Sequence, residues 1–147
     1  MKAVIQRVKN SSVSVDGQIV NQIGKGLNVL LGIHVTDTFE DIDYLVRKIV
    51  NLRIFDDEDG VMNKSILDID GSILSISQFT LQADTKKGNR PSYANAMKSE
   101  DAILLYEKFN MELNKFVPTY PGIFGADMSV EIINDGPITI IIDSKDK

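Results

Sequence analysis

Two short segments of the chain hold the polar groups that could do chemistry. The first is Ser77-Gln78-Phe79-Thr80-Leu81, at the end of an apolar run, and the second is Asn134-Asp135-Gly136-Pro137-Ile138-Thr139, between two apolar runs. The chain has no cysteine and one histidine, and the sequence contains no cluster of metal ligands. Any reaction must therefore rest on backbone groups, on hydroxyls or on the substrate itself. We expect no metal and no cofactor.

Thr80 is the natural nucleophile to consider in the first segment. A hydroxyl nucleophile needs a positioned base, and the segment contains neither histidine nor lysine. His34, the single histidine, ends an apolar run and has no identifiable partner, so we interpret it as structural. A general esterase that pairs Thr80 with a carboxylate, such as Asp84 or Asp127, is an alternative.

The second segment has two interpretations. Asn-Asp-Gly between apolar runs is a common hairpin signal, so a plain turn at 134–136 is the default. Pro137 complicates this turn, because proline has no N–H for a strand ladder and restricts the residue before it. A cis peptide bond before Pro137 is the alternative, and it would point the Gly136 carbonyl in a different direction.

The elements that must position these segments are short strands and two helices. Strands are expected over 3–8, 12–15, 18–23, 27–34, 52–55, 72–81, 129–133 and 138–143. Thr38 is expected to cap an amphipathic helix, and Ser99 a second one. The core stripe of the second helix is predicted to be Ile103, Leu104, Tyr106, Phe109, Leu113 and Phe116.

The order of these elements shows no regular strand–helix alternation. It indicates an α+β fold, with a mainly antiparallel, curved or barrel-like sheet and two long amphipathic helices outside. We expect a single domain over 1–147, because a chain of this length buries a sizeable core. No apolar run reaches the roughly 20 residues that cross a bilayer, so membrane insertion is not expected. The absence of cysteine favours the cytoplasm.

Charge limits the kind of nucleic-acid contact that the chain can make. A net charge of −5 argues against a protein that coats nucleic acid. The densest basic patch is the loop 84–92, which carries Lys86, Lys87 and Arg90. The acidic run 56–60 lacks the ligand spacing of a calcium loop, so we interpret it as a solvated turn.

Together, the two segments resemble the two signature motifs of the D-aminoacyl-tRNA deacylases, also called D-tyrosyl-tRNA(Tyr) deacylases. Ile138 stands where valine is commoner in that family. The resemblance extends over almost the whole chain. Its other stretches are Ala3-Val4-Ile5-Gln6-Arg7-Val8, Asn51-Leu52-Arg53-Ile54-Phe55, Lys87-Gly88-Asn89-Arg90-Pro91-Ser92 and Phe124-Gly125-Ala126-Asp127-Met128.

The resemblance implies chiral proofreading in translation quality control. The expected reaction is hydrolysis of the ester bond of D-aminoacyl-tRNA, and to some degree of glycyl-tRNA, which releases the amino acid and the tRNA. The expected enzyme is a homodimer whose active sites lie at the interface, each combining residues 77–81 of one subunit with Gly136-Pro137 of the other. The Gly136–Pro137 bond is expected to be cis, with carbonyls that bind the α-amino group and exclude an L-residue. Arg7 is expected to brace this loop.

The resemblance also suggests roles for further residues. The backbone N–H groups of Phe79 and Thr80 are expected to stabilise the oxyanion, while the 2′-hydroxyl of the substrate helps to activate water. Ser77 and Gln78 are placed in the same catalytic segment. The residues expected to bind the aminoacylated 3′ end of tRNA are Lys86, Lys87, Arg90, Phe124 and Met128. Two alternatives stay open, a covalent Thr80 nucleophile and a non-catalytic dimeric module that binds tRNA or protein.

Overall fold

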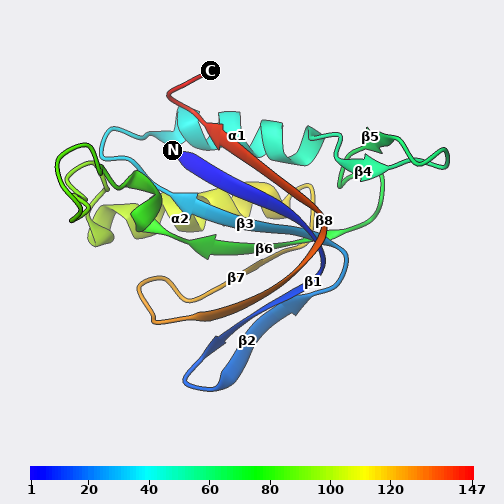
Figure 1. The fold of residues 1–147 in the computed structure, drawn as a ribbon, viewed down its shortest axis with the longest axis horizontal. Helices are drawn as coiled ribbons and strands as arrows, with labels where there is room; N and C mark the ends of the chain where they lie inside the picture. Colours follow the sequence, from blue (N-terminus) through cyan, green and yellow to red (C-terminus); the bar gives the residue numbers. More distant parts are fainter.

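The computed structural model describes residues 1–147. Its main sheet has the strand order β2-β1-β3-β6-β7, with β8 paired to β1 (Figure 1). The elements are β1 (Lys2–Val15), β2 (Gln18–Ile23), β3 (Gly26–Gly32), α1 (Phe39–Asn51), β4 (Phe55–Asp56), β5 (Met62–Lys64), β6 (Ser72–Ser77), the 3₁₀ turn η1 (Phe79–Gln82), α2 (Ser99–Asn114), β7 (Thr119–Pro121) and β8 (Ser129–Asp143). β4 and β5 form a separate small hairpin.

β1 holds the sheet together because it pairs with three strands. Its first half, Lys2–Val8, is antiparallel to β3, and its second half, Ser11–Val15, is antiparallel to β2. β8 runs along the other edge of β1 for nearly its whole length. We expected two strands here, at 3–8 and 12–15, and the structure has one long curved strand instead. Its curvature turns the sheet toward a barrel (Figure 1).

The predicted fold class is confirmed. Most strand pairs are antiparallel, but β3 pairs with β6 in parallel, and so does β6 with β7. Because parallel strands present their carboxyl ends at the same edge, the chain that follows β6 starts beside the chain that follows β7. No helix is both long and apolar enough to cross a membrane.

Both helices bury one face against the sheet. The predicted cap of α1 is confirmed, because Thr38 and Asp41 form a capping box. The cap of α2 was predicted wrongly, since Lys98 takes the N-cap position and Ser99 is the first helical residue. The buried residues of α2 are Ala102, Tyr106, Phe109 and Leu113. We placed Leu104 and Phe116 in the core, but Leu104 is 61% exposed because it lies off this face, and Phe116 is 57% exposed and lies beyond the end of the helix.

A buried polar network joins the start of β1, the end of β8 and the start of α1. The α-amino group of Met1 donates to Asp37 Oδ1 at 2.7 Å and to Ser144 Oγ at 2.8 Å. Ser144 Oγ in turn donates to Asp41 Oδ1 at 2.6 Å. Lys145 Nζ lies 3.3 Å from Asp37 Oδ1 and 3.1 Å from Asp41 Oδ1. In their charged form, the carboxylates of this network therefore help to stabilise the fold.

We expect the fold to lose stability in acid through Asp41. Burial opposes its charge, but hydrogen bonds from Ser144 and Thr38, with Lys145 nearby, outweigh burial and lower the pKa of Asp41 to about 2. Because this pKa is lower in the folded state than in the unfolded state, the stabilisation is present above about pH 4 and is lost as the pH falls toward 2. Allowing for solvent screening, the loss is about 1 kcal/mol. Urea unfolding at pH 5 and pH 2.5 measures this loss as a difference in the free energy of unfolding. Asp41→Asn should reduce that difference, and an unchanged difference would contradict the assignment to Asp41.

Candidate active site

The first wall of the site is the segment after β6. The chain leaves the strand at Ser77, and Gln78 N donates to Leu31 O of β3 at 2.7 Å. Residues 79–82 then form η1 rather than the continued strand that we predicted. Gly32 on β3 permits this turn, because a Cβ there would lie 2.7 Å from the Cβ of Leu81. The close approach of η1 to β3 thus fixes the direction of the segment.

The backbone of η1 leaves two N–H groups available. Its first internal hydrogen bond runs from Leu81 N to Gln78 O, at 3.2 Å, so the N–H groups of Phe79 and Thr80 have no partner within the turn. The Thr80 hydroxyl accepts a hydrogen bond from Gln78 Nε2 at 2.6 Å, and no basic group contacts it. The geometry offers backbone donors here but no base for a Thr80 nucleophile.

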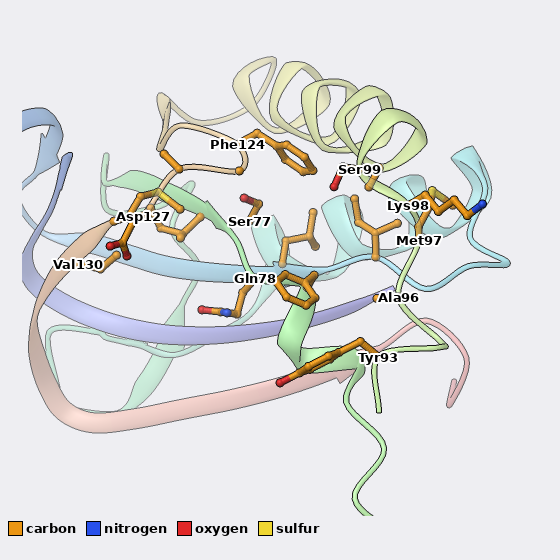
Figure 2. Close-up of a pocket in the computed structure, with 18 residues that line it drawn as sticks. Ser77, Gln78, Tyr93, Ala96, Met97, Lys98, Ser99, Phe124, Asp127 and Val130 are labelled. Atoms are coloured by element: carbon orange, nitrogen blue, oxygen red, sulfur yellow. The ribbon is translucent and has the colours of Figure 1, made fainter. Parts of the chain in front are cut away.

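A cavity of about 660 Å³ opens beside this wall. Figure 2 shows Ser77 and Gln78 on it together with Phe124 and Asp127, which come from the loop between β7 and β8. Thr80 does not line the cavity. The apolar lining of the cavity includes Leu31, Ile33, Ile76, Met97, Ala102, Met128 and Val130. The cavity therefore joins an apolar surface to a polar rim, as is common for small-ligand sites.

Tyr106 of α2 links the two walls of the cavity. The carbonyl oxygen of Ser75, two residues before Ser77, accepts a hydrogen bond from Tyr106 Oη at 2.7 Å and another from Gly122 N at 3.0 Å. The Tyr106 ring also packs on Phe124, with centroids 5.7 Å apart. Burial is the main cause that raises the pKa of the Tyr106 hydroxyl, so the group stays a neutral donor.

We expect Tyr106→Phe to loosen the wall that carries Phe124 while the fold survives. The variant loses one buried hydrogen bond, worth about 1 kcal/mol, and keeps the bond from Gly122 N. The KM for the substrate should rise severalfold with little change in kcat, since no reacting group is removed. Steady-state kinetics measure the changes in KM and in kcat separately. Tyr120→Phe, at a 40% exposed position on β7, is the matched control, and a fall in kcat alone for Tyr106→Phe would contradict the assignment.

The second predicted segment lies within β8, so the plain hairpin turn at 134–136 was wrong. β1 pairs Gln6 with Thr139 and Val8 with Asn134, which leaves Arg7 opposite the bulged segment Asp135–Ile138. The Gly136–Pro137 peptide is cis, which agrees with the second interpretation. Gly136 has φ +132°, a conformation that side chains rarely adopt.

Arg7 braces this bulge from a buried position. Its Nε donates to Asp135 O at 3.0 Å, and its Nη1 donates to Ile54 O at 2.8 Å. Two carboxylates, those of Asp56 and Asp135, each lie 3.5 Å from the guanidinium. A planar guanidinium suits this task, because its donors are held in a fixed fork.

The structure brings together only part of the predicted site. Ser77, Gln78 and Phe79 share the cavity with Phe124 and Met128. Gly136 and Pro137 are exposed and do not line it, and neither does Arg7. Of the three basic residues in the loop, Lys86 lines a second, smaller cleft, whereas Lys87 and Arg90 are exposed. Within one chain, the proposed chiral filter and the proposed catalytic wall are therefore separate.

Sequence reasoning missed several residues that line the cavity. Tyr93 packs edge-on against Phe79, with centroids 5.0 Å apart, at the cavity mouth. The sequence feature that could have identified Tyr93 is its position directly after the basic loop. It lies one residue beyond Ser92, where one of the stretches that resemble the family ends. Met97, Lys98 and Ser99, at the start of α2, were also missed as site residues. Asp127 was considered only as a carboxylate partner for Thr80.

Comparison with known proteins decides the family. The sequence model described as D-Tyr-tRNA(Tyr) deacylase matches residues 4–143. The chain belongs to this family. It is therefore a D-aminoacyl-tRNA deacylase, a hydrolase, as the sequence motifs implied.

Two solved structures have the same fold. One, described as c-Myc DNA Unwinding Element Binding Protein, is 46% identical and superposes with a TM-score of 0.93, covering 97% of this chain and 98% of that one. The other, described as a probable eukaryotic D-amino acid tRNA deacylase, is 16% identical with a TM-score of 0.83, covering 96% and 97%. At 16% identity, the second likeness concerns the fold alone.

Proposed function

We propose that the deacylase hydrolyses the ester of D-aminoacyl-tRNA, and of glycyl-tRNA to a lesser degree, as a chiral proofreading homodimer. The observation that carries this proposal is the segment 77–80, of which Ser77, Gln78 and Phe79 line the cavity and Thr80 follows directly after them. It has two backbone N–H groups without a partner in their turn, and no base beside the Thr80 hydroxyl. Such a wall suits an activated ester that supplies its own hydroxyl.

The proposed reaction uses few protein groups. The substrate 2′-hydroxyl orients a water molecule, whose oxygen attacks the ester carbonyl. The N–H groups of Phe79 and Thr80 donate to the resulting oxyanion, and the ribose oxygen leaves with a proton. One oxyanion donor is typically worth about 100-fold or more in rate, so two backbone donors account for a large part of the catalysis. Ser77 and Gln78 shape the wall.

The proposed chiral filter comes from the partner subunit. Gly136 and Pro137 are exposed and lie outside the cavity of their own chain. Arg7 nevertheless holds the segment rigidly through Asp135. A rigid, exposed loop suits insertion into the cavity of a second copy, where its carbonyls accept from the α-amino group and its backbone excludes an L side chain.

The 3′ end of tRNA is proposed to enter the cavity past the aromatic pair Phe79 and Tyr93. Phe124 and Met128 supply apolar cavity surface for the terminal nucleoside, and Lys86, Lys87 and Arg90 in the neighbouring loop supply charge for phosphates. None of these three cations forms an ion pair within the chain, so each is available to the tRNA. A substrate of this kind is consistent with the expected cytoplasmic location.

A deacylation assay on three substrates tests the function. D-tyrosyl-tRNA should be hydrolysed at least about 100-fold faster than L-tyrosyl-tRNA, since the filter rejects by steric exclusion. Glycyl-tRNA should react measurably, because glycine has no side chain to exclude. Inertness toward all three would support the non-catalytic alternative. That alternative is kept because the name of the 46% identical structure describes a DNA-binding protein.

Thr80→Ala distinguishes the two mechanisms. If the backbone N–H groups stabilise the oxyanion, the variant should keep its kcat within about threefold of wild type, because alanine retains the backbone donor. If the hydroxyl is a covalent nucleophile, kcat should fall by several orders of magnitude. Single-turnover hydrolysis of D-tyrosyl-tRNA measures the difference, and Ser77→Ala controls for the loss of a neighbouring hydroxyl.

A further inference from the structure

Three cations gather around one tyrosine ring on α1, away from the cavity. Arg47 Cζ, Lys48 Nζ and Lys147 Nζ lie 5.9, 5.8 and 4.8 Å from the ring centroid of Tyr44. Lys147 reaches this ring because the chain beyond β8 passes over α1 (Figure 1). We call these four residues the Tyr44 cluster.

The cluster has no acidic partner within the chain. None of its three cations lies within ion-pair distance of a carboxylate, although acidic residues flank them in sequence. On α2, by contrast, Lys108 and Lys115 both pair with Glu112. Like charges repel, and an aromatic face compensates for only part of that repulsion at an exposed site. Such an arrangement in a chain of net charge −5 favours an anionic partner.

A polar cleft lies between the basic loop beside the cavity and the chain that leads to Lys147 of the Tyr44 cluster. This cleft of about 370 Å³ is lined by the chain after η1, including Lys86, and by Lys145, two residues before Lys147. Its three lysines, Lys2, Lys86 and Lys145, outnumber its two aspartates by one. Asp84 and Asp143 lie in it, and each accepts a backbone N–H at 2.9 Å, from Lys86 and Lys145 respectively. The cleft therefore carries a small excess of positive charge between the basic loop and the chain that leads to the Tyr44 cluster.

We infer that the Tyr44 cluster is a second contact for RNA, and that it binds backbone phosphates of the acceptor arm whose 3′ end occupies the cavity. The inference rests on the proposed function. Exposed cations around an aromatic ring suit phosphates with an adjacent sugar or base. A membrane surface fits less well, because anionic lipid recognition usually takes clusters of about four to eight basic residues. The basic loop and the cluster thus act on one continuous anion.

The double variant Arg47→Gln/Lys48→Gln tests the inference. Both residues are exposed, and glutamine is compatible with a helix. The dissociation constant for uncharged tRNA should rise about tenfold, and the slope of its logarithm against log salt should become shallower by about 2, for two lost phosphate contacts. The catalytic efficiency on D-tyrosyl-tRNA should fall about tenfold relative to that on 3′-D-tyrosyl-adenosine, which lacks an acceptor arm.

The matched control is Lys9→Gln/Lys25→Gln, which makes the same change of charge at two exposed, unpaired lysines elsewhere. Equal tRNA affinity and salt slope in the two double variants would overturn the inference. So would a loss of binding to vesicles with anionic lipid while tRNA affinity stays unchanged. If wild type leaves D-tyrosyl-tRNA intact but Arg47→Gln/Lys48→Gln still binds tRNA more weakly than wild type, the proposed function fails and the RNA contact stands.

Discussion

Arg7→Ala should abolish most of the activity and also weaken the fold. The variant removes the donors to Asp135 O and Ile54 O and leaves the Asp56 and Asp135 carboxylates without their cation. The loss of two charge-assisted hydrogen bonds from a buried guanidinium costs about 3 kcal/mol of unfolding free energy, and the partly exposed carboxylates add little to this. The segment that carries Gly136 also loses its brace. If this segment supplies the chiral filter, catalytic efficiency on D-tyrosyl-tRNA should fall about 100-fold or more, since small displacements of positioning groups cost that much.

Arg7→Lys separates the two effects. Lysine keeps a positive charge at the carboxylates, but it is a point donor and does not span two carbonyls in fixed directions. We expect most of the stability to return while most of the activity stays lost. Urea unfolding and deacylation assays on the same preparations measure both. Arg53→Ala is the control, because Arg53 is exposed and donates to a backbone carbonyl, Asn63 O, at 3.0 Å. Full activity in a stable Arg7→Ala protein would remove Arg7 from the positioning of this loop.

Features set by neighbours in sequence were predictable. The first helix follows from local chemistry, because Thr38 and Asp41 cap each other three residues apart and the apolar residues behind them repeat at helical spacing. The turn at Asp16-Gly17 likewise depends on those two residues, both of which have positive φ. The signature segments gave the family directly, since their residue types are unusual together.

Features set by distant contacts were not predictable from local pattern. The strand that we extended to residue 81 ends at Ser77, because Gln78 bonds to Leu31 and η1 packs on Gly32. Nothing within residues 72–81 signals that contact. The plain turn considered at 134–136 is absent for the same reason, because the segment is held by Arg7, which lies 128 residues away from Asp135 in the sequence. Apolar alternation shows that a strand exists but not what interrupts it.

Mixing two inactive variants should restore activity if each active site combines two subunits. Ser77→Leu fills the cavity from its wall, because Ser77 lines it (Figure 2). Gly136→Ala strains the opposite segment, since Gly136 has φ +132° and a Cβ there would lie 2.9 Å from Ile138 N. Each homodimer should be at least about 100-fold less active than wild type, because every site has one defective half.

A heterodimer of these two variants has both defects in one site and none in the other. Random pairing makes about half of all dimers heterodimers, so coexpression should recover about a quarter of wild-type activity. The control pairs Ser77→Leu with Gly32→Ala, where the added Cβ meets Leu81. Both defects then affect the same wall, every site is damaged, and no activity should return. If the first pair also stays inactive while size-exclusion chromatography and mass spectrometry show heterodimers, each site is built within one chain, and the Gly136–Pro137 segment must act on its own subunit.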